Sequence, residues 1–140
     1  MSRETAFTAL FTKLQGVAGV VTVSRKLDLL ENVPPPKMPA LYVTLGNQTI
    51  ATKVGFPPKR TLRANVFLYV AASDATVASG TLLNPLLDAI EAALAPAAPQ
   101  VQQTLGGAVA HAWIEGTIDV YEAVKTQRAA ALIPITMLIP

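Results

Sequence analysis

The segment from Thr61 to Asp74, TLRANVFLYVAASD, alternates between apolar and other residues more clearly than any other part of the chain. A period of two is that of a β-strand, whose successive side chains point to opposite faces of a sheet. One face is wholly apolar and must meet a core; its residues are Leu62, Ala64, Val66, Leu68 and Val70. The other face begins polar and ends with Phe67 and Tyr69, and aromatic side chains outside a core indicate a partner surface.

Two helices are predicted, one on each side of this strand in the sequence. Ser2 is suited to be a helix N-cap, and apolar residues follow it at spacings of three and four until Gly16. A second helical region is predicted over about residues 75–95, with Gly80 and Asn84 as alternative places for a break in it. Ser73–Asp74 and Asn84–Pro85 both supply N-cap signals. Its apolar stripe consists of Leu83, Leu86, Leu87, Ile90 and Leu94.

The remaining periodic segments predict more strands. They are expected over residues 21–27, 40–46, 109–115, 117–121 and 129–139. Gly46–Asn47 indicates a turn or a bend, and Gly116 is predicted to mark a bulge. The last segment is apolar on both faces, so it is either central in the sheet or covered by a neighbour. The prediction is one domain over residues 1–140 of the α+β class, with a mixed, mainly antiparallel sheet and two main helices packed on it.

Two segments without periodicity are candidates for surface features. Residues 28–39 are proline-rich and are expected to form an extended linker on the surface. Residues 48–60 are expected to be a projecting hairpin or long loop. The cations of this loop are Lys53, Lys59 and Arg60, and they fit a solvated flank as well as a contact site for a partner or for DNA phosphates.

The composition favours assembly. Only 14% of the residues are charged and 51% are hydrophobic, so the surface of a lone monomer would be poor in charge, and part of the apolar material is expected in subunit contacts. The chain has no cysteine and no signal-peptide pattern, which predicts an intracellular protein without disulfides. The longest apolar run, residues 129–140, is shorter than the roughly 18 residues of a spanning helix, so no membrane partner is expected.

The residues offer little material for catalysis. His111 is the only histidine and has no nucleophile near it in the sequence, so a structural or exposed imidazole is favoured over a catalytic base. Glu115 and Asp119 could in principle work as an acid–base pair, but carboxylates at strand edges more commonly face water or a cation. No metal-ligand spacing and no phosphate-binding glycine loop is present. The chain is therefore predicted not to be an enzyme and to have no cofactor and no metal.

Four segments carry a family resemblance through their order and spacing. They are RETAFTALFTKL, TLLNPLLDAIEAAL, TLGGAVAHAWIEGTI and AALIPITMLI. Taken together they resemble the tail terminator family of long-tailed bacteriophages, the minor tail protein U type. The likeness covers most of the chain and lies in segments that determine the fold. It implies an α+β fold with helices against a mixed sheet.

The resemblance also implies a function. Proteins of that family form a ring, generally a hexamer, at the head-proximal end of the tail tube. The ring ends tube polymerisation and presents the surface that the head connector or neck protein joins, with a channel for the genomic DNA. The implied partners are further copies of the chain, the tail tube protein and the connector. The implied location is the virion tail, reached through the host cytoplasm during assembly.

Individual contacts are expected as follows. The residues expected at an oligomer or tube interface are Phe56, Phe67, Tyr69, Trp113 and Glu115, and the alternative for each is a place in the core or on a solvated surface. Those expected at ionic contacts between subunits or toward a DNA channel are Arg25, Lys53, Lys59 and Arg60. Two rival hypotheses stay open: a small module that binds a peptide or nucleic acid through the proline-rich arm and basic loop, and an enzyme working through His111, Glu115 and Asp119.

Overall fold

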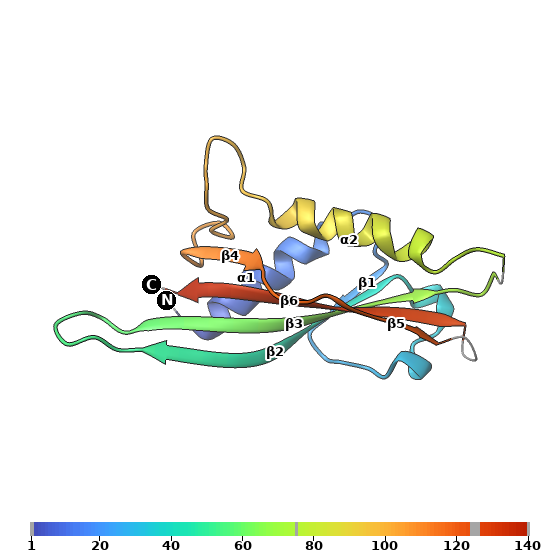
Figure 1. The fold of residues 1–140 in the computed structure, drawn as a ribbon, viewed down its shortest axis with the longest axis horizontal. Helices are drawn as coiled ribbons and strands as arrows, with labels where there is room; N and C mark the ends of the chain where they lie inside the picture. Colours follow the sequence, from blue (N-terminus) through green and yellow to red (C-terminus); the bar gives the residue numbers. More distant parts are fainter. Residues whose placement is uncertain (1, 75, 124–126, 140) are drawn as a thin grey trace.

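The computed structural model describes residues 2–74, 76–123 and 127–139. Within them the chain forms two α-helices, two short 3-10 turns and a six-stranded sheet (Figure 1). The helical elements are α1 (Arg3–Gln15), η1 (Leu30–Asn32), η2 (Pro35–Lys37) and α2 (Gly80–Leu94). The strands are β1 (Thr22–Ser24), β2 (Ala40–Ala51), β3 (Lys59–Ala71), β4 (His111–Ile114), β5 (Asp119–Ala123) and β6 (Arg128–Ile139).

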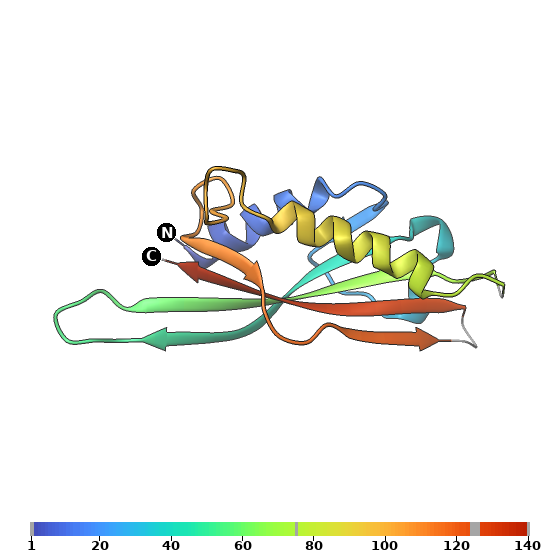
Figure 2. The same ribbon diagram turned by 45° about the horizontal axis from the view of Figure 1, so that its top comes forward.

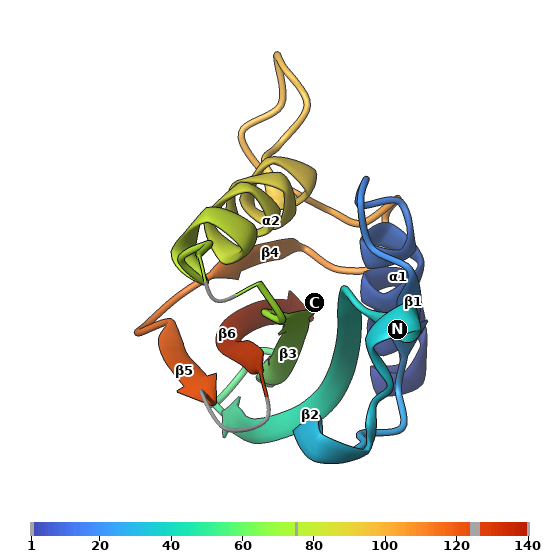
Figure 3. The same cartoon turned by 90° about the vertical axis from the view of Figure 1, so that its right-hand side faces the viewer.

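The sheet has the order β1–β2–β3–β6–β4, and β5 also pairs with β6. β1 and β2 run parallel and the other pairs run antiparallel, so the sheet is mixed and mainly antiparallel. Figures 2 and 3 show both helices over the same face of this twisted sheet. The predicted α+β class, with two helices packed on such a sheet, is confirmed.

α1 begins and ends where its residues predict. The Ser2 hydroxyl accepts a hydrogen bond from the Thr5 N–H at 3.0 Å, which satisfies a backbone donor that the first turn leaves free. The apolar stripe then buries Phe7, Leu10 and Leu14 against the sheet. The helix ends at Gly16, as predicted.

α2 starts later than the sequence suggests. Its first residue is Gly80, and the expected start at Ala75 lies outside the described residues. The Asp74 carboxylate instead accepts hydrogen bonds from the Thr76 N–H and hydroxyl, which forms a turn ahead of the helix. Pro85 lies in the second turn of α2 and removes one backbone hydrogen bond without ending the helix.

The core lies between the helices and the two central strands. From β3 it takes all five apolar residues of the predicted face, Leu62, Ala64, Val66, Leu68 and Val70. From β6 it takes Ala129, Ala131, Ile133, Ile135, Met137 and Ile139. β6 lies between β3 on one side and β4 and β5 on the other, so the predicted two-sided apolar strand is central.

β4 and β5 pair with successive parts of the same side of β6, and Gly116 lies between them. The ladder resumes after Ile114–Ile135 only at Asp119–Leu132, so Gly116 marks a joint between two strands and not a bulge within one. Its φ of +108° is a conformation that glycine adopts readily. A Cβ there would also lie 3.5 Å from Pro134 Cγ, which ties the joint to the proline of β6.

The β2–β3 hairpin is longer than the sequence predicts. β2 runs on to Ala51 through Gly46–Asn47, where the sequence predicts a turn or a bend. The chain does not turn there but has a bulge that shifts the register between Leu45 and Gln48. The hairpin therefore projects beyond the rest of the sheet (Figure 1), as a projecting hairpin was predicted to do. β1, in contrast, is shorter than residues 21–27 and keeps only three of them.

The proline-rich arm, residues 28–39, is more than a linker. It folds into η1 and η2 and buries Leu30, Val33 and Met38 on the second face of the sheet, against Tyr42 and Tyr69. This second cluster covers one end of the face that the helices leave open. The expectation of an extended surface connection is thus corrected, because apolar residues before and among the prolines reach the sheet.

Gly46→Ala should destabilise the fold, by about 1–3 kcal/mol. A Cβ at this position would lie 2.9 Å from the Arg63 carbonyl oxygen, a backbone atom that cannot move without breaking the ladder. Gly80→Ala is the matched control, since its Cβ meets nothing closer than the Asn84 side chain at 3.7 Å. It should leave stability unchanged or raise it by up to about 1 kcal/mol. Urea unfolding of both variants measures the difference, and equal midpoints would contradict the expectation.

Candidate interaction surfaces

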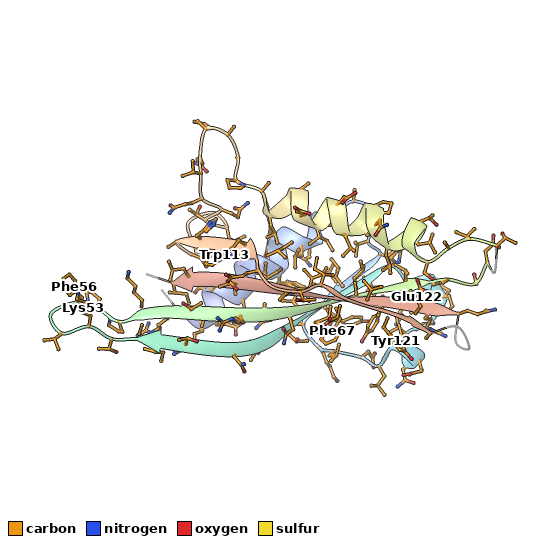
Figure 4. The ribbon with its side chains drawn as sticks, in the orientation of Figure 1. Lys53, Phe56, Phe67, Trp113, Tyr121 and Glu122 are labelled. Atoms are coloured by element: carbon orange, nitrogen blue, oxygen red, sulfur yellow. The ribbon has the colours of Figure 1, made fainter. Side chains whose placement is uncertain are left out.

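The hairpin tip, defined here as residues 51–59, is apolar and basic. Val54 is 96% exposed and Phe56 63% exposed at the far end of the projecting hairpin (Figure 4). The Lys53 ammonium lies 5.2 Å from the centroid of the Phe56 ring, a cation–π contact that orders both side chains. Residues 46–65 include four cations and no carboxylate; the cations are Lys53, Lys59, Arg60 and Arg63.

A groove lies between the arm and β5 on the face of the sheet that the helices leave open. Its volume is about 390 Å³. Its floor is made of Phe67, Ala130 and Leu132, and the exposed side chains of Leu29 and Tyr121 form its two walls. Figure 4 shows Phe67 and Tyr121 near one another, at a distance from the hairpin tip. We call this surface the arm–β5 groove.

The charges of the groove are acidic. Among the described residues, Glu31 from η1 and Asp119 from β5 are its charged lining residues. Both are exposed, so their carboxylates face solvent at the rim of an apolar floor. The groove is thus opposite in charge to the hairpin tip and similar to it in apolar character.

Tyr69 is not a surface aromatic, which corrects the expectation that a second copy would cover it. Its phenol donates a hydrogen bond to the Asp28 carbonyl oxygen at 2.8 Å, and its ring centroid lies 5.2 Å from that of Tyr42. Burial under the arm raises the pKa of Tyr69, and the nearby Tyr42, Glu31 and Asp28 add to the effect. Phe67, by contrast, stays half-buried and lines the groove.

Trp113 and Glu115 lie elsewhere on the open face. The half-buried Trp113 stacks on His111 with ring centroids 4.8 Å apart, and Glu115 accepts a hydrogen bond from the Thr136 hydroxyl at 3.3 Å. His111 Nδ1 accepts a hydrogen bond from the Gln103 N–H at 3.0 Å, which holds the imidazole in a structural role.

Two residues of the enzyme hypothesis, His111 and Asp119, are not brought together. His111 pairs with Leu138, whereas Asp119 pairs with Leu132, which lies six residues earlier in β6. At the rise of a strand this separates their backbones by roughly 20 Å. A direct acid–base pair between these two residues is therefore excluded. Glu115 and Asp119 lie closer together, because the Glu115 N–H donates to the Pro134 carbonyl oxygen, two residues from Leu132. Within the described ranges, no group of three or more His, Cys, Asp and Glu residues could hold a metal ion.

The predicted cations fall into two places. Lys53, Lys59 and Arg60 gather on the hairpin, whereas Arg25 forms an ion pair with Glu4 of α1 and lies over the Phe7 ring. This hydrogen-bonded pairing lowers the pKa of Glu4. Arg25 is thus engaged within its own subunit, and its expected contact with another subunit or with DNA stays a prediction.

Sequence reasoning missed several groove residues, chiefly Leu29, Glu31, Val120 and Tyr121. The signal for Tyr121 was present, because it alternates with Val120 in a predicted strand. Its exposure follows from the position of β5 at the edge of the sheet, which the alternation does not reveal. In the part of the chain that the structure describes, no helix is long and apolar enough to cross a bilayer.

Comparison with known proteins identifies similar folds. No family model and no curated protein matches the sequence. A chain from the virion of a native gene transfer agent (GTA) particle is 14% identical and has a TM-score of 0.58, and the match covers 99% of this chain and 98% of that one. A second solved structure, of a protein named only by a sequence identifier, is 13% identical with a TM-score of 0.53, over 100% and 96% of the two chains. The shared property is the fold, from end to end.

Tyr69→Phe should lower the free energy of unfolding by about 0.5–1.5 kcal/mol, because it leaves the Asp28 carbonyl without its donor. The pH dependence has a defined sign. A raised pKa means that the folded state favours the neutral phenol, so this stabilisation is present below the unfolded-state pKa of about 10 and is lost as the pH rises through the folded-state pKa.

The wild-type protein should therefore lose stability above about pH 10, and Tyr69→Phe should make that loss shallower. Urea titrations at pH 8 and at pH values above 10 measure both effects. Tyr121→Phe, at an exposed position on β5, is the control and should change neither. An alkaline loss of the same size in Tyr69→Phe and wild type would show that Tyr69 does not contribute to it.

Proposed function

We propose that this chain is a structural protein of a phage-like particle, which forms a ring at the head-proximal end of the tail tube. The ring ends tube polymerisation and provides the surface to which the head is joined. The observation that carries the proposal is the agreement in fold, over nearly the full length of both chains, with a chain of a GTA virion. The resemblance to tail terminator proteins points to the ring and to its place in the tail.

The surfaces of the molecule suit such an assembly. The hairpin tip and the arm–β5 groove are exposed apolar regions at different ends of one sheet (Figure 4). Exposed apolar patches of this kind usually mark contacts with other proteins. Contacts between two different surfaces of identical subunits are heterologous, and they generate rings when the rotation between copies closes.

A catalytic role has little support in the geometry. The imidazole of His111 is stacked on Trp113 and hydrogen-bonded to the Gln103 backbone. Asp119 lies well along the sheet from it. The function proposed here therefore rests on binding surfaces and on shape.

The wild-type protein should form closed rings, either alone as its concentration rises or when it meets the ends of tail tubes. Mass photometry and negative-stain microscopy measure the ring and its subunit number. When the protein is added to polymerising tube protein, tube growth should stop and the rings should be seen at one end of each tube. Monomers under all conditions, together with unrestricted tube growth, would overturn the proposal.

A second candidate function is binding of nucleic acid, favoured by the hairpin's four cations without a carboxylate. If the hairpin contacts DNA phosphates, the triple change Lys53→Gln, Lys59→Gln and Arg60→Gln should reduce the slope of log K against log salt by up to about 2.7. Its matched control removes three exposed cations elsewhere, Lys13, Lys26 and Lys37, and should leave the slope unchanged. Fluorescence anisotropy with a labelled duplex at several salt concentrations measures it, and equal slopes would count against DNA binding.

A further inference from the structure

The hairpin tip and the arm–β5 groove are complementary surfaces of the same chain. The tip presents Val54 and Phe56 next to Lys53 and Lys59, with no carboxylate within residues 46–65. The groove presents an apolar floor with Glu31 and Asp119 at its rim, and its lining has neither Lys nor Arg among the residues that the structure describes. In a specific protein interface, apolar surface packs against apolar surface and cations lie opposite carboxylates.

We infer that the hairpin tip of one copy binds in the arm–β5 groove of the next copy. The two surfaces lie at different ends of the sheet, so the hairpin tip of a molecule cannot reach the groove of the same molecule (Figure 4). A second copy carries the same basic tip and the same acidic groove. Charge complementarity therefore favours the tip of a second copy as the occupant of the groove. This inference rests on the proposed ring function, because the contact would link neighbouring subunits of that ring.

Phe56 is the anchor of this contact. Buried aromatic side chains dominate interface energetics, and a groove of about 390 Å³ falls within the range of pockets that hold small ligands. The ring of Phe56 would face Phe67 and Leu132 on the floor, between the walls formed by Leu29 and Tyr121. Lys53 and Lys59 would then lie over the carboxylates at the rim.

The tip is already ordered for binding. The β2–β3 ladder continues to the pair Ala51–Lys59, so only a short loop lies beyond the last backbone pair. The cation–π contact of Lys53 with Phe56 further restricts the side chain that binds. Pre-organisation lowers the entropic cost of association, and a rigid hairpin also fixes the direction in which the next copy lies.

Cysteine cross-linking tests the contact directly, because the natural chain has no cysteine. Phe56→Cys and Tyr121→Cys are made in separate copies and mixed under mild oxidation. We expect a disulfide-linked dimer that contains one copy of each variant, at a yield about tenfold or more above the control. The control pairs Phe56→Cys with Val101→Cys, an apolar position that is 85% exposed and lies outside the groove lining.

The double variant Phe56→Cys, Tyr121→Cys should give a ladder of linked species that ends in one closed product. A dimer formed mainly between two Phe56→Cys copies would overturn the inference, since it would indicate tip-to-tip contact. Equal yields for Tyr121→Cys and Val101→Cys would overturn it as well.

Complementation provides a second test. Phe56→Ser and Tyr121→Ser alter exposed side chains and should keep the wild-type circular dichroism spectrum. Each variant alone should associate about tenfold or more weakly than wild type. A mixture should form dimers only, through the one intact tip and the one intact groove. A Phe56→Ser protein that assembles as wild type does would contradict the inference.

These outcomes separate the contact from the proposed function. Closed rings without the Phe56–Tyr121 cross-link would leave the ring function in place and overturn the contact. A cross-linked ladder that never closes, in a protein that forms no rings on tubes, would support the contact and overturn the ring. Monomers that neither cross-link nor assemble would overturn both.

Discussion

The pairing of β6 on both of its sides is the constraint on which the rest of the structure depends. β6 is apolar on both faces, and such a strand is stable only where its backbone groups are paired and its side chains covered. β3 pairs with its full length, from Arg60–Ile139 to Ala71–Arg128, and β4 and β5 share its other side. The helices then cover one face, and the other face is covered only in part.

The open surfaces follow from this arrangement. Among the described strands, β5 pairs only with β6, so it lies at the edge of the sheet, separated by Gly116 from β4, which packs against α2. Its side chains Val120 and Tyr121 are therefore exposed although they alternate like core residues. The arm buries Tyr69 and forms the wall of the groove opposite β5. The exposed edge at β5 is therefore the second wall of that groove.

Much of the fold could be predicted because its signals are local. The apolar face of β3, the two-sided character of β6 and the Ser2 cap of α1 each depend on residues a few positions apart. Features that depend on distant contacts could not be predicted in this way. The bulge at Gly46 depends on the approach of the Arg63 carbonyl, and the burial of Tyr69 depends on an arm forty residues away. The groove required both the strand order and the arm, so the sequence identified Phe67 and Tyr69 but not the groove that they line.

In the proposed contact, the hairpin tip and the arm–β5 groove lie at different ends of one sheet. The geometry of an assembly built on this contact therefore depends on the shape of that sheet. The hairpin continues β2 and β3, so its direction is set by their twist and by the bulge at Gly46, where the register shifts. Bulges increase local twist and bend a strand. In a head-to-tail assembly the rotation between copies decides whether the chain of subunits closes or continues as a filament. Under the proposed contact, the residue that shapes the hairpin therefore also contributes to the number of subunits in the ring.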